Sequence, residues 1–453
     1  MCGLIAVGVV HKFGRHKSAG VREHADGTAV DVPARERSVR WAAEMLGVNE
    51  ALAVPRPALI PMSSMVRDHT LAQRGGMVGQ LGARIIRATP HAFPSLTPEK
   101  TGPGRWGDAD AFFSAAAAAN LSVIATLAPW DTPEEGVAAG GYVPKDMAAW
   151  RTWVGLVVER YDADGTDDFD GDTPDITWEV DNEPDLHHAR PPRGLEGQPP
   201  PKDYETAEEY ARVFVATFGA IRRADAAANV LLGGIYQIGS PTGQAYLKTV
   251  LANGGMNADG LSVHVYFDAD NLAPIHHDMQ VARDLAPDMP VWVTETGVPA
   301  TADPTRARTR DATWVTPEWQ ARMVPAIVGA FLSEGAEAVL WHPLVEAPDA
   351  GQSPGAFRRN ALFVGVEGGI GDATPRPAAA VYSRLATILA KVETGSMHEI
   401  EAEGGRLLQT NRGWLVFEGT VRPPEGTETM LDLLTGRVGA VPSEVAAPAW
   451  LQR

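Results

Sequence analysis

The feature that most constrains the fold is a repeated alternation of strand-like and helix-like segments between about residues 66 and 392. The strand-like runs are short and rich in Val, Ile and Leu. They show no alternation of polar and apolar residues, as expected for strands that protein covers on both faces. Short connections join them to the helix-like segments. This pattern is typical of β/α units that build a parallel sheet.

Seven strands follow directly from the pattern, and we expect an eighth within 46–62. The seven predicted strands are 83–89, 121–130, 175–185, 229–236, 260–268, 290–299 and 336–346. Helices are predicted over 66–82, 109–120, 143–161, 206–223, 243–254, 276–286, 316–335 and 377–392. Eight such repeats predict a closed (β/α)8 TIM barrel. A doubly wound open sheet is the alternative, but no Gly-rich phosphate loop follows the first strand.

The pattern changes beyond about residue 394, where short alternating segments are separated by turn residues. We predict three parts: an N-terminal segment (1–45), a catalytic barrel (46–393) and a small, sandwich-like antiparallel β-domain (394–453). The apolar runs 4–10 and 28–33 precede the barrel. We expect at least one of them to pair with the C-terminal sheet.

Charge and cysteine content exclude several classes of function. The formal net charge is -18, and such a field repels phosphate backbones and anionic membranes. We therefore expect no nucleic-acid partner. The single cysteine, Cys2, allows neither an internal disulfide nor a cysteine-based zinc site. The sequence shows no recognisable signal peptide or membrane segment, so the cytoplasm is the default location. A wrongly assigned start codon that removed a leader would leave export open.

Polar and aromatic residues stand where the apolar strands end. In a (β/α)8 barrel the carboxyl ends of the strands form the active site. The residues at these ends are Arg87, Trp130, Asn182, Glu183, His264, Tyr266, Glu295 and Trp341. Two carboxylates on opposite sides of a barrel mouth, with hydrogen-bond partners and a flat ring, are what glycosidic bond cleavage with retention requires. No metal or cofactor is expected.

The segments "WEVDNEPD" and "VWVTETG" resemble the pattern of glycoside hydrolase clan A, the retaining (β/α)8-barrel glycosidases. The resemblance covers roughly residues 66–392. By overall sequence pattern it is closest to the β-xylosidase/α-iduronidase and cellulase/mannanase families. Two features depart from it. Asp181 stands where many members carry a glycine or an apolar or aromatic residue, and the third strand ends in "LAPW" without the histidine of the cellulase-type branch.

The resemblance implies a role for each matching residue. Glu183 would be the general acid/base and Glu295 the nucleophile. Asn182 would bond the sugar 2-hydroxyl. Arg87 and Tyr266 would orient the nucleophile. His264 would line the subsite, and Trp341 would lie under the sugar. Trp130 follows the third strand and could also stack on sugar.

The predicted function is a retaining O-glycoside hydrolase that acts on a β-linked oligo- or polysaccharide by double displacement. A catalytically silent, carbohydrate-binding barrel is the alternative. Cys2 in "MCGLIAVGVV" also resembles the N-terminal nucleophile of class II glutamine amidotransferases, although the segment that follows lacks their glutamine-binding residues. The sugar, the linkage, endo or exo action and the oligomeric state stay open.

Overall fold

The computed structural model divides the chain into two units, Met1–Arg40 and Trp41–Arg453. It describes residues 20–23, 29–32, 46–50, 78–88, 96–129, 143–144, 146–186, 206–266, 271–300, 315–344, 360–366, 369–393 and 396–452. In the first unit, β1 (Gly20–Glu23) pairs antiparallel with β2 (Ala29–Val32). Residues 4–10 and Cys2 lie outside the described residues, so their predicted roles stay predictions.

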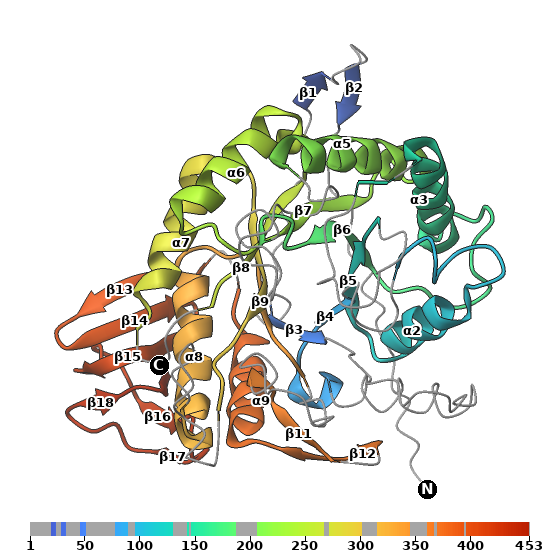
Figure 1. The fold of residues 1–453 in the computed structure, drawn as a ribbon. Coiled ribbons are helices and arrows are strands. Elements are labelled where there is room, and N and C mark those ends of the chain that lie inside the picture. The colour runs from blue at the N-terminus through green and yellow to red at the C-terminus, as the bar shows by residue number, and fades with distance from the viewer. Residues whose placement is uncertain are drawn as a thin grey trace, which may run out of the picture. The chain divides into compact units, whose positions relative to one another are not determined.

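Eight parallel strands form a closed barrel at the centre of the second unit (Figure 1). In chain order they are β3 (Leu46–Glu50), β4 (Ile85–Ala88), β5 (Ser122–Leu127), β6 (Ile176–Asn182), β7 (Asn229–Ile235), β8 (Gly260–His264), β9 (Val291–Thr296) and β10 (Ala338–Trp341). Neighbours in the chain are neighbours in the barrel, and β10 closes it against β3. The predicted (β/α)8 barrel is confirmed.

Helices alternate with these strands, as predicted. They are α2 (Gly107–Ala118), α3 (Met147–Tyr161), α5 (Ala207–Ala224), α6 (Pro241–Ala252), α7 (Ala273–Leu285), α8 (Pro317–Ser333) and α9 (Pro377–Leu389). The capping box predicted from Thr206 and Glu209 is present at the start of α5. Of the helix predicted over 66–82, only its end lies within the described residues.

Side chains alternate along each strand between the barrel interior and the surrounding helices. The interior is filled near its amino end by a separate apolar cluster of Ile85, Ile124, Leu231, Trp292, Ala338 and Leu340. Two positions further along β4 and β9, Arg87 and Thr294 face the same interior but are polar. The apolar layer therefore lies below a polar layer nearer the carboxyl ends of the strands, where the active site is predicted from the sequence.

The C-terminal segment folds into an antiparallel sheet, as predicted. Its strands are β13 (His398–Ala402), β14 (Gly405–Thr410), β15 (Gly413–Val421), β16 (Thr429–Asp432), β17 (Val438–Gly439), β18 (Val445–Ala446) and β19 (Ala449–Gln452). One face, including Leu415 and Phe417, joins the barrel core. Gly329 of α8 allows this contact, since a Cβ there would lie 2.7 Å from Cβ of Phe417.

A hairpin that the sequence pattern did not predict precedes α9. Its strands are β11 (Phe363–Val366) and β12 (Gly369–Pro375), which pair antiparallel. Glycine and proline are frequent here, and they weaken the strand signal in the sequence. Within the described part of the chain, no helix is long and apolar enough to cross a membrane.

Candidate active site

The end of β6 has an unusual backbone. Asp181 and Glu183 have positive φ angles of 67° and 51°, which side-chain-bearing residues adopt rarely. The Asp181 carboxylate stabilises the first of these, because its Oδ1 accepts the backbone N–H of Asn182 at 2.7 Å. Backbone strain of this kind is common at functional sites. Here it lies where β6 ends, at Asp181 and Glu183.

Arg87 of β4 connects the strands that carry the site. Its side chain is completely buried and donates three hydrogen bonds. Nη1 donates to Glu295 Oε1 at 2.8 Å, and Nη2 donates to Asn182 Oδ1 at 2.8 Å. Nε donates to Glu179 Oε2 at 2.7 Å. The planar guanidinium group thereby fixes an amide and two carboxylates from β6 and β9 in one arrangement.

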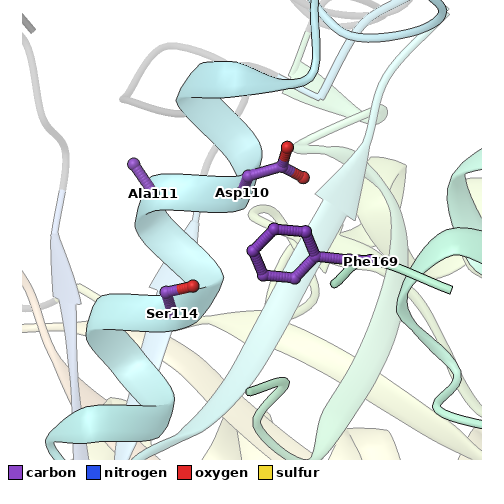
Figure 2. Close-up of a pocket in the computed structure, with 4 residues that line it drawn as sticks. All are labelled: Asp110, Ala111, Ser114 and Phe169. Atoms are coloured by element: carbon purple, nitrogen blue, oxygen red, sulfur yellow. The ribbon is translucent and has the colours of Figure 1, made fainter. Parts of the chain in front are cut away.

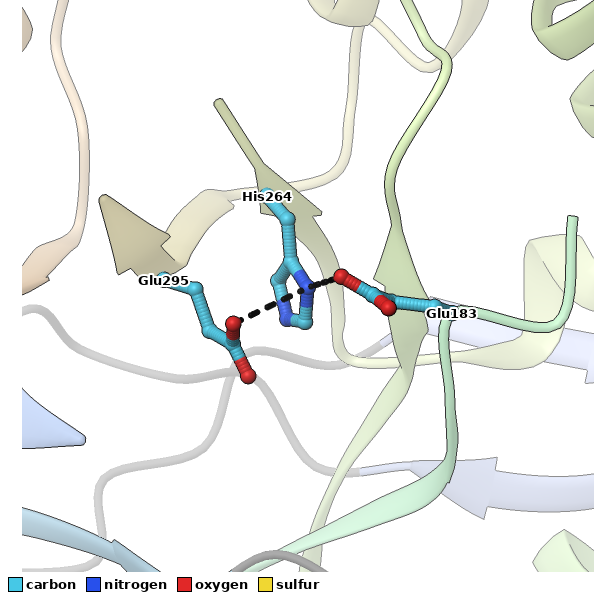
Figure 3. A group of neighbouring side chains, drawn as sticks. All are labelled: Glu183, His264 and Glu295. Carbon is cyan, nitrogen blue, oxygen red and sulfur yellow. Dashed lines mark hydrogen bonds and ion pairs between the residues drawn. The ribbon is translucent and has the colours of Figure 1, made fainter. Parts of the chain in front are cut away.

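Glu183, His264 and Glu295 form the centre of the site (Figure 3). Nδ1 of His264 lies 2.8 Å from Glu183 Oε1 and 3.7 Å from Glu295 Oε2, so the imidazole stands between the carboxylates. One oxygen of each carboxylate lies within 4.8 Å of the other. Carboxyl groups in retaining glycosidases are about 5–5.5 Å apart, whereas inverting enzymes keep them at about 6.5–9.5 Å. An oxygen-to-oxygen distance of no more than 4.8 Å agrees with the first arrangement and not with the second.

The surroundings of Glu295 favour its anionic form. Burial alone would raise its pKa, but nearby positive charge and a hydrogen bond from Tyr266 lower the pKa overall. Burial also lowers the pKa of His342, which is therefore uncharged at neutral pH. The lasting positive charge thus comes from Arg87, helped by His264, whose pKa the two glutamates raise against the effect of burial.

Tyr266 acts as a hydrogen-bond donor to Glu295. Its hydroxyl donates to Oε2 at 2.8 Å, while Arg87 occupies Oε1. Burial, followed by the charges of Glu295 and Glu183, raises the pKa of Tyr266 well above its usual value. The phenol therefore keeps its proton at neutral pH. Both oxygens of Glu295 are held by donors, which fixes the orientation of the carboxylate.

Asp185, at the end of the "NEPD" sequence, ties two loops of the site together. Its carboxylate accepts the backbone N–H groups of Tyr236 and Gln237 at 2.9 and 2.7 Å. The Tyr236 ring in turn lies against Tyr266, with centroids 6.2 Å apart. Asp185 thus connects the segment after β6 to the one after β7, beside the tyrosine that holds Glu295.

The structure brings six of the predicted site residues together: Arg87, Asn182, Glu183, His264, Tyr266 and Glu295. Trp341 is adjacent in the barrel but only 1% exposed, and its indole N–H donates to the backbone oxygen of Asn360 at 2.7 Å. A sugar could stack on this ring only if it became more exposed, so its role as a platform stays a prediction. Trp130 lies outside the described residues.

Sequence reasoning missed Glu179 and His342. Glu179 is completely buried in β6 and binds Arg87. An acidic residue inside an otherwise apolar strand was the available signal. His342 follows β10 directly and is half-buried near the charged groups of the site. The strand-end rule that selected Trp341 applies equally to the residue after it.

Gly234 of β7 makes room for His264. A Cβ at this position would overlap the imidazole ring. We expect Gly234→Ala to displace His264 from Glu183 and to lower kcat by about 100-fold, because small misplacements of catalytic groups cost about that much. Overpacking should also reduce the free energy of unfolding by about 1–3 kcal/mol. Steady-state kinetics and urea denaturation measure the two effects.

Gly155 provides a matched control for this substitution. It lies within α3, and a Cβ there would contact nothing within 4 Å. Gly155→Ala should keep full activity and should raise stability by about 0.5–1 kcal/mol, since alanine favours a helix over glycine. Equal activity of Gly234→Ala and Gly155→Ala would contradict the assigned role of His264.

Three groups of side chains in the described residues have the spacing of metal ligands, but their contacts are not those of a metal site. At His276, Glu334 and Glu399, Arg283 and Arg406 already pair with the two carboxylates. At Glu183, His264 and Glu295, both oxygens of Glu295 are already held by donors, and the Arg87 cation lies 2.8 Å away. Asp162, Asp164 and Asp168 lie in the acidic loop before β6. There, Asp168 accepts the backbone N–H groups of Ala163 and Gly165, and these contacts shape the loop itself.

A separate hollow of about 350 Å³ lies on the outer side of the barrel (Figure 2). Asp110, Ala111 and Ser114 of α2 line it together with Phe169. The Asp110 carboxylate is already bound by Arg160 at 2.8 and 2.9 Å and by the Tyr161 hydroxyl. Because Asp110 is the only carboxylate among the lining residues and is already bound, this hollow lacks the pair of carboxyl groups that glycosidic bond cleavage needs.

The fold and the site together define a (β/α)8 barrel with paired carboxylates at the ends of β6 and β9. No protein-family model matches the sequence, and no curated protein is significantly similar to it. Solved structures with the same fold are nevertheless numerous, and they include several glycoside hydrolases, in agreement with the clan A resemblance.

Three of these structures cover most of the chain. A glucosidase from Croceicoccus marinus is 13% identical over 89% of this chain and 81% of its own, with a TM-score of 0.51. A GH39 β-xylosidase from Caulobacter crescentus is 15% identical over 87% and 83%, with a TM-score of 0.52. A family 51 α-L-arabinofuranosidase from Bifidobacterium longum is 13% identical over 91% and 96%, with a TM-score of 0.53. The chain shares their fold.

Proposed function

We propose that this protein is a retaining O-glycoside hydrolase with Glu183 as the acid/base and Glu295 as the nucleophile. The observation that carries the proposal is the spacing of the two carboxylates, whose oxygens approach within 4.8 Å at the mouth of the barrel. The asymmetry of their partners supports the assignment of roles. Glu295 is held as an anion by Arg87 and Tyr266, as a nucleophile requires.

The first step of the proposed reaction forms a covalent intermediate. A Glu295 oxygen attacks the anomeric carbon while the bond to the leaving oxygen breaks. Glu183 gives its proton to that oxygen, so the aglycone departs as an alcohol. Asn182, oriented by Arg87, is the amide that would bond the sugar 2-hydroxyl. Because Glu295 becomes an ester, the negative charge at the nucleophile is lost in this step.

The second step releases the sugar. Glu183, now a carboxylate, takes a proton from water as the water oxygen attacks the anomeric carbon. The ester bond to Glu295 breaks, and that carboxylate regains its charge. His264 lies 2.8 Å from Glu183, the carboxyl group that loses its proton in the first step and regains one in the second. Two inversions leave the anomeric configuration unchanged.

We propose a β-linked oligo- or polysaccharide as the substrate. The β-xylosidase named above and an exo-β-1,4-mannosidase from an Opitutaceae bacterium, with a TM-score of 0.51, support this class. Neither identifies the sugar, because the loops beyond the strand ends decide specificity. A panel of aryl β-glycosides that differ only in the sugar measures it directly.

Replacing the proposed acid/base should affect poor and good leaving groups differently. We expect Glu183→Ala to lower kcat/KM for an alkyl or unactivated aryl glycoside by about 100- to 10,000-fold, the usual contribution of general acid catalysis. A dinitrophenyl glycoside needs no protonation of its leaving group, so formation of the intermediate should be nearly unaffected. Initial rates across a series of leaving groups measure this difference.

Azide provides the control for Glu183→Ala. It needs no general base, so it should restore turnover of the dinitrophenyl substrate and give a glycosyl azide of retained β configuration. An equal loss for all leaving groups, without azide rescue, would contradict the assignment. Sugar binding with no turnover by the unchanged protein would instead support a carbohydrate-binding barrel.

A further inference from the structure

Glu179 lies beneath the two proposed catalytic carboxylates. It belongs to β6, four residues before Glu183, and its side chain is fully buried. Glu179 Oε2 accepts from Arg87 Nε and from Thr126, each at 2.7 Å. Oε1 accepts from Ser262 at 2.7 Å and from Thr294 at 3.3 Å. Donors from β4, β5, β8 and β9 thus converge on one carboxylate in the barrel interior.

Arg87 pairs with two carboxylates, of which only one would lose its charge during the proposed reaction. Its ion pair with Glu295 is 2.8 Å long, and its ion pair with Glu179 is 2.5 Å long. Glu295 would lose its charge when it forms the glycosyl ester, whereas Glu179 lies below the site and keeps its charge. A buried cation without a counter-ion is costly, because burial removes the water that would otherwise solvate it.

We propose that Glu179 is a positioning residue that keeps Arg87 charge-balanced while the nucleophile is esterified. This inference rests on the proposed function. In the free enzyme, Arg87 faces two carboxylates. In the covalent intermediate it contacts one, and the pair is neutral, because the charge that Glu183 gains lies beside His264. Without the charge of Glu179, the same step would leave Arg87 as a buried, unpaired cation.

The two chemical steps should therefore respond in opposite ways to the loss of this charge. Forming the ester removes the remaining counter-ion of Arg87, so Glu179→Gln should slow this step by about 10- to 100-fold, the usual effect of removing a partner behind a site residue. Breaking the ester restores a carboxylate beside Arg87. Hydrolysis of the intermediate should therefore be unchanged or faster. A purely structural role would slow both steps together.

Trapping the intermediate separates the two rates. We suggest the 2,4-dinitrophenyl 2-deoxy-2-fluoro-β-D-xyloside, β-D-glucoside and β-D-mannoside as probes, since the fluorine slows both steps enough to measure them. The rate of inactivation reports ester formation, and the return of activity after the probe is removed reports ester hydrolysis. For Glu179→Gln we expect inactivation to slow by about 10- to 100-fold with reactivation at least as fast as in the unchanged protein.

Two variants serve as controls. Glu179→Asp retains the charge with a shorter side chain, so its ratio of the two rates should stay near that of the unchanged protein even if both fall. Asp110→Asn breaks another bidentate pair with an arginine, outside the barrel, and should change stability but neither rate.

The outcomes distinguish the two proposals. If the unchanged protein hydrolyses one of these three aryl β-glycosides but the matching fluorinated probe does not label Glu295, the proposed function fails and the role of Glu179 fails with it. If the unchanged protein is labelled but Glu179→Gln slows both steps equally, only the charge-balancing role is overturned. A change confined to ester formation supports both.

Discussion

Glu295→Gln should reduce the hydrolysis of an activated aryl glycoside by roughly 10,000-fold or more, as loss of a nucleophile does in other enzymes. The amide retains the volume of the carboxylate but cannot attack the anomeric carbon. It also no longer balances Arg87 and accepts from Tyr266 less strongly. Initial rates with a dinitrophenyl glycoside measure the loss.

Glu334→Gln is the matched control for this substitution. Glu334 also accepts from an arginine and contacts a histidine, Arg283 at 2.5 Å and His276 at 2.6 Å, but it lies just beyond α8. This variant should keep wild-type activity. A small substitution at residue 295 gives a second check: with azide, Glu295→Gly should form an α-glycosyl azide by a single inversion. Wild-type turnover by Glu295→Gln would refute the assignment.

Arg87→Met should produce the largest loss of stability. The substitution leaves Glu179 and Glu295 buried without their cation, and breaking a buried ion pair in this way costs about 3–5 kcal/mol. Urea denaturation at neutral pH measures the loss. Arg212→Met is the control, since Arg212 is 67% exposed and its pair with Glu209 should contribute less than about 1 kcal/mol.

The difference in the free energy of unfolding between the unchanged protein and Arg87→Met should become smaller as the pH falls. In the unchanged protein the folded-state pKa of Glu295 is lowered, so its contribution to stability is present above its unfolded pKa and is lost as the pH falls. Without Arg87, burial of Glu295 is opposed mainly by His264 and Tyr266, so the pKa of Glu295 should be higher than in the unchanged protein and the folded variant takes up a proton more readily. A deficit that grows between neutral and mildly acidic pH would contradict this charge balance.

Much of the barrel could be predicted because each β/α unit carries its own signal. The strands β5 to β9 are short, largely apolar runs, and the box of Thr206 and Glu209 marks the start of α5. These signals are local. The hairpin β11–β12 was missed because its three glycines and one proline weaken the pattern of a strand.

The sequence could predict those residues of the candidate site that stand at the ends of strands. Counting strands placed Glu183 and Glu295 at the same mouth, and closure of the barrel brings them together from 112 residues apart. What could not be predicted depends on packing. The burial of Trp341 follows from its bond to Asn360, and the importance of Glu179 follows from four neighbours on four strands.

The anomeric configuration of the first-formed product tests the central claim most directly. Proton NMR can follow hydrolysis of an aryl β-glycoside from the first minutes, before the sugar mutarotates. Double displacement by carboxylates within 4.8 Å of each other predicts that the β anomer appears first and the α anomer only later. Initial release of the α anomer would mean a single displacement by water, which contradicts Glu295 as the nucleophile.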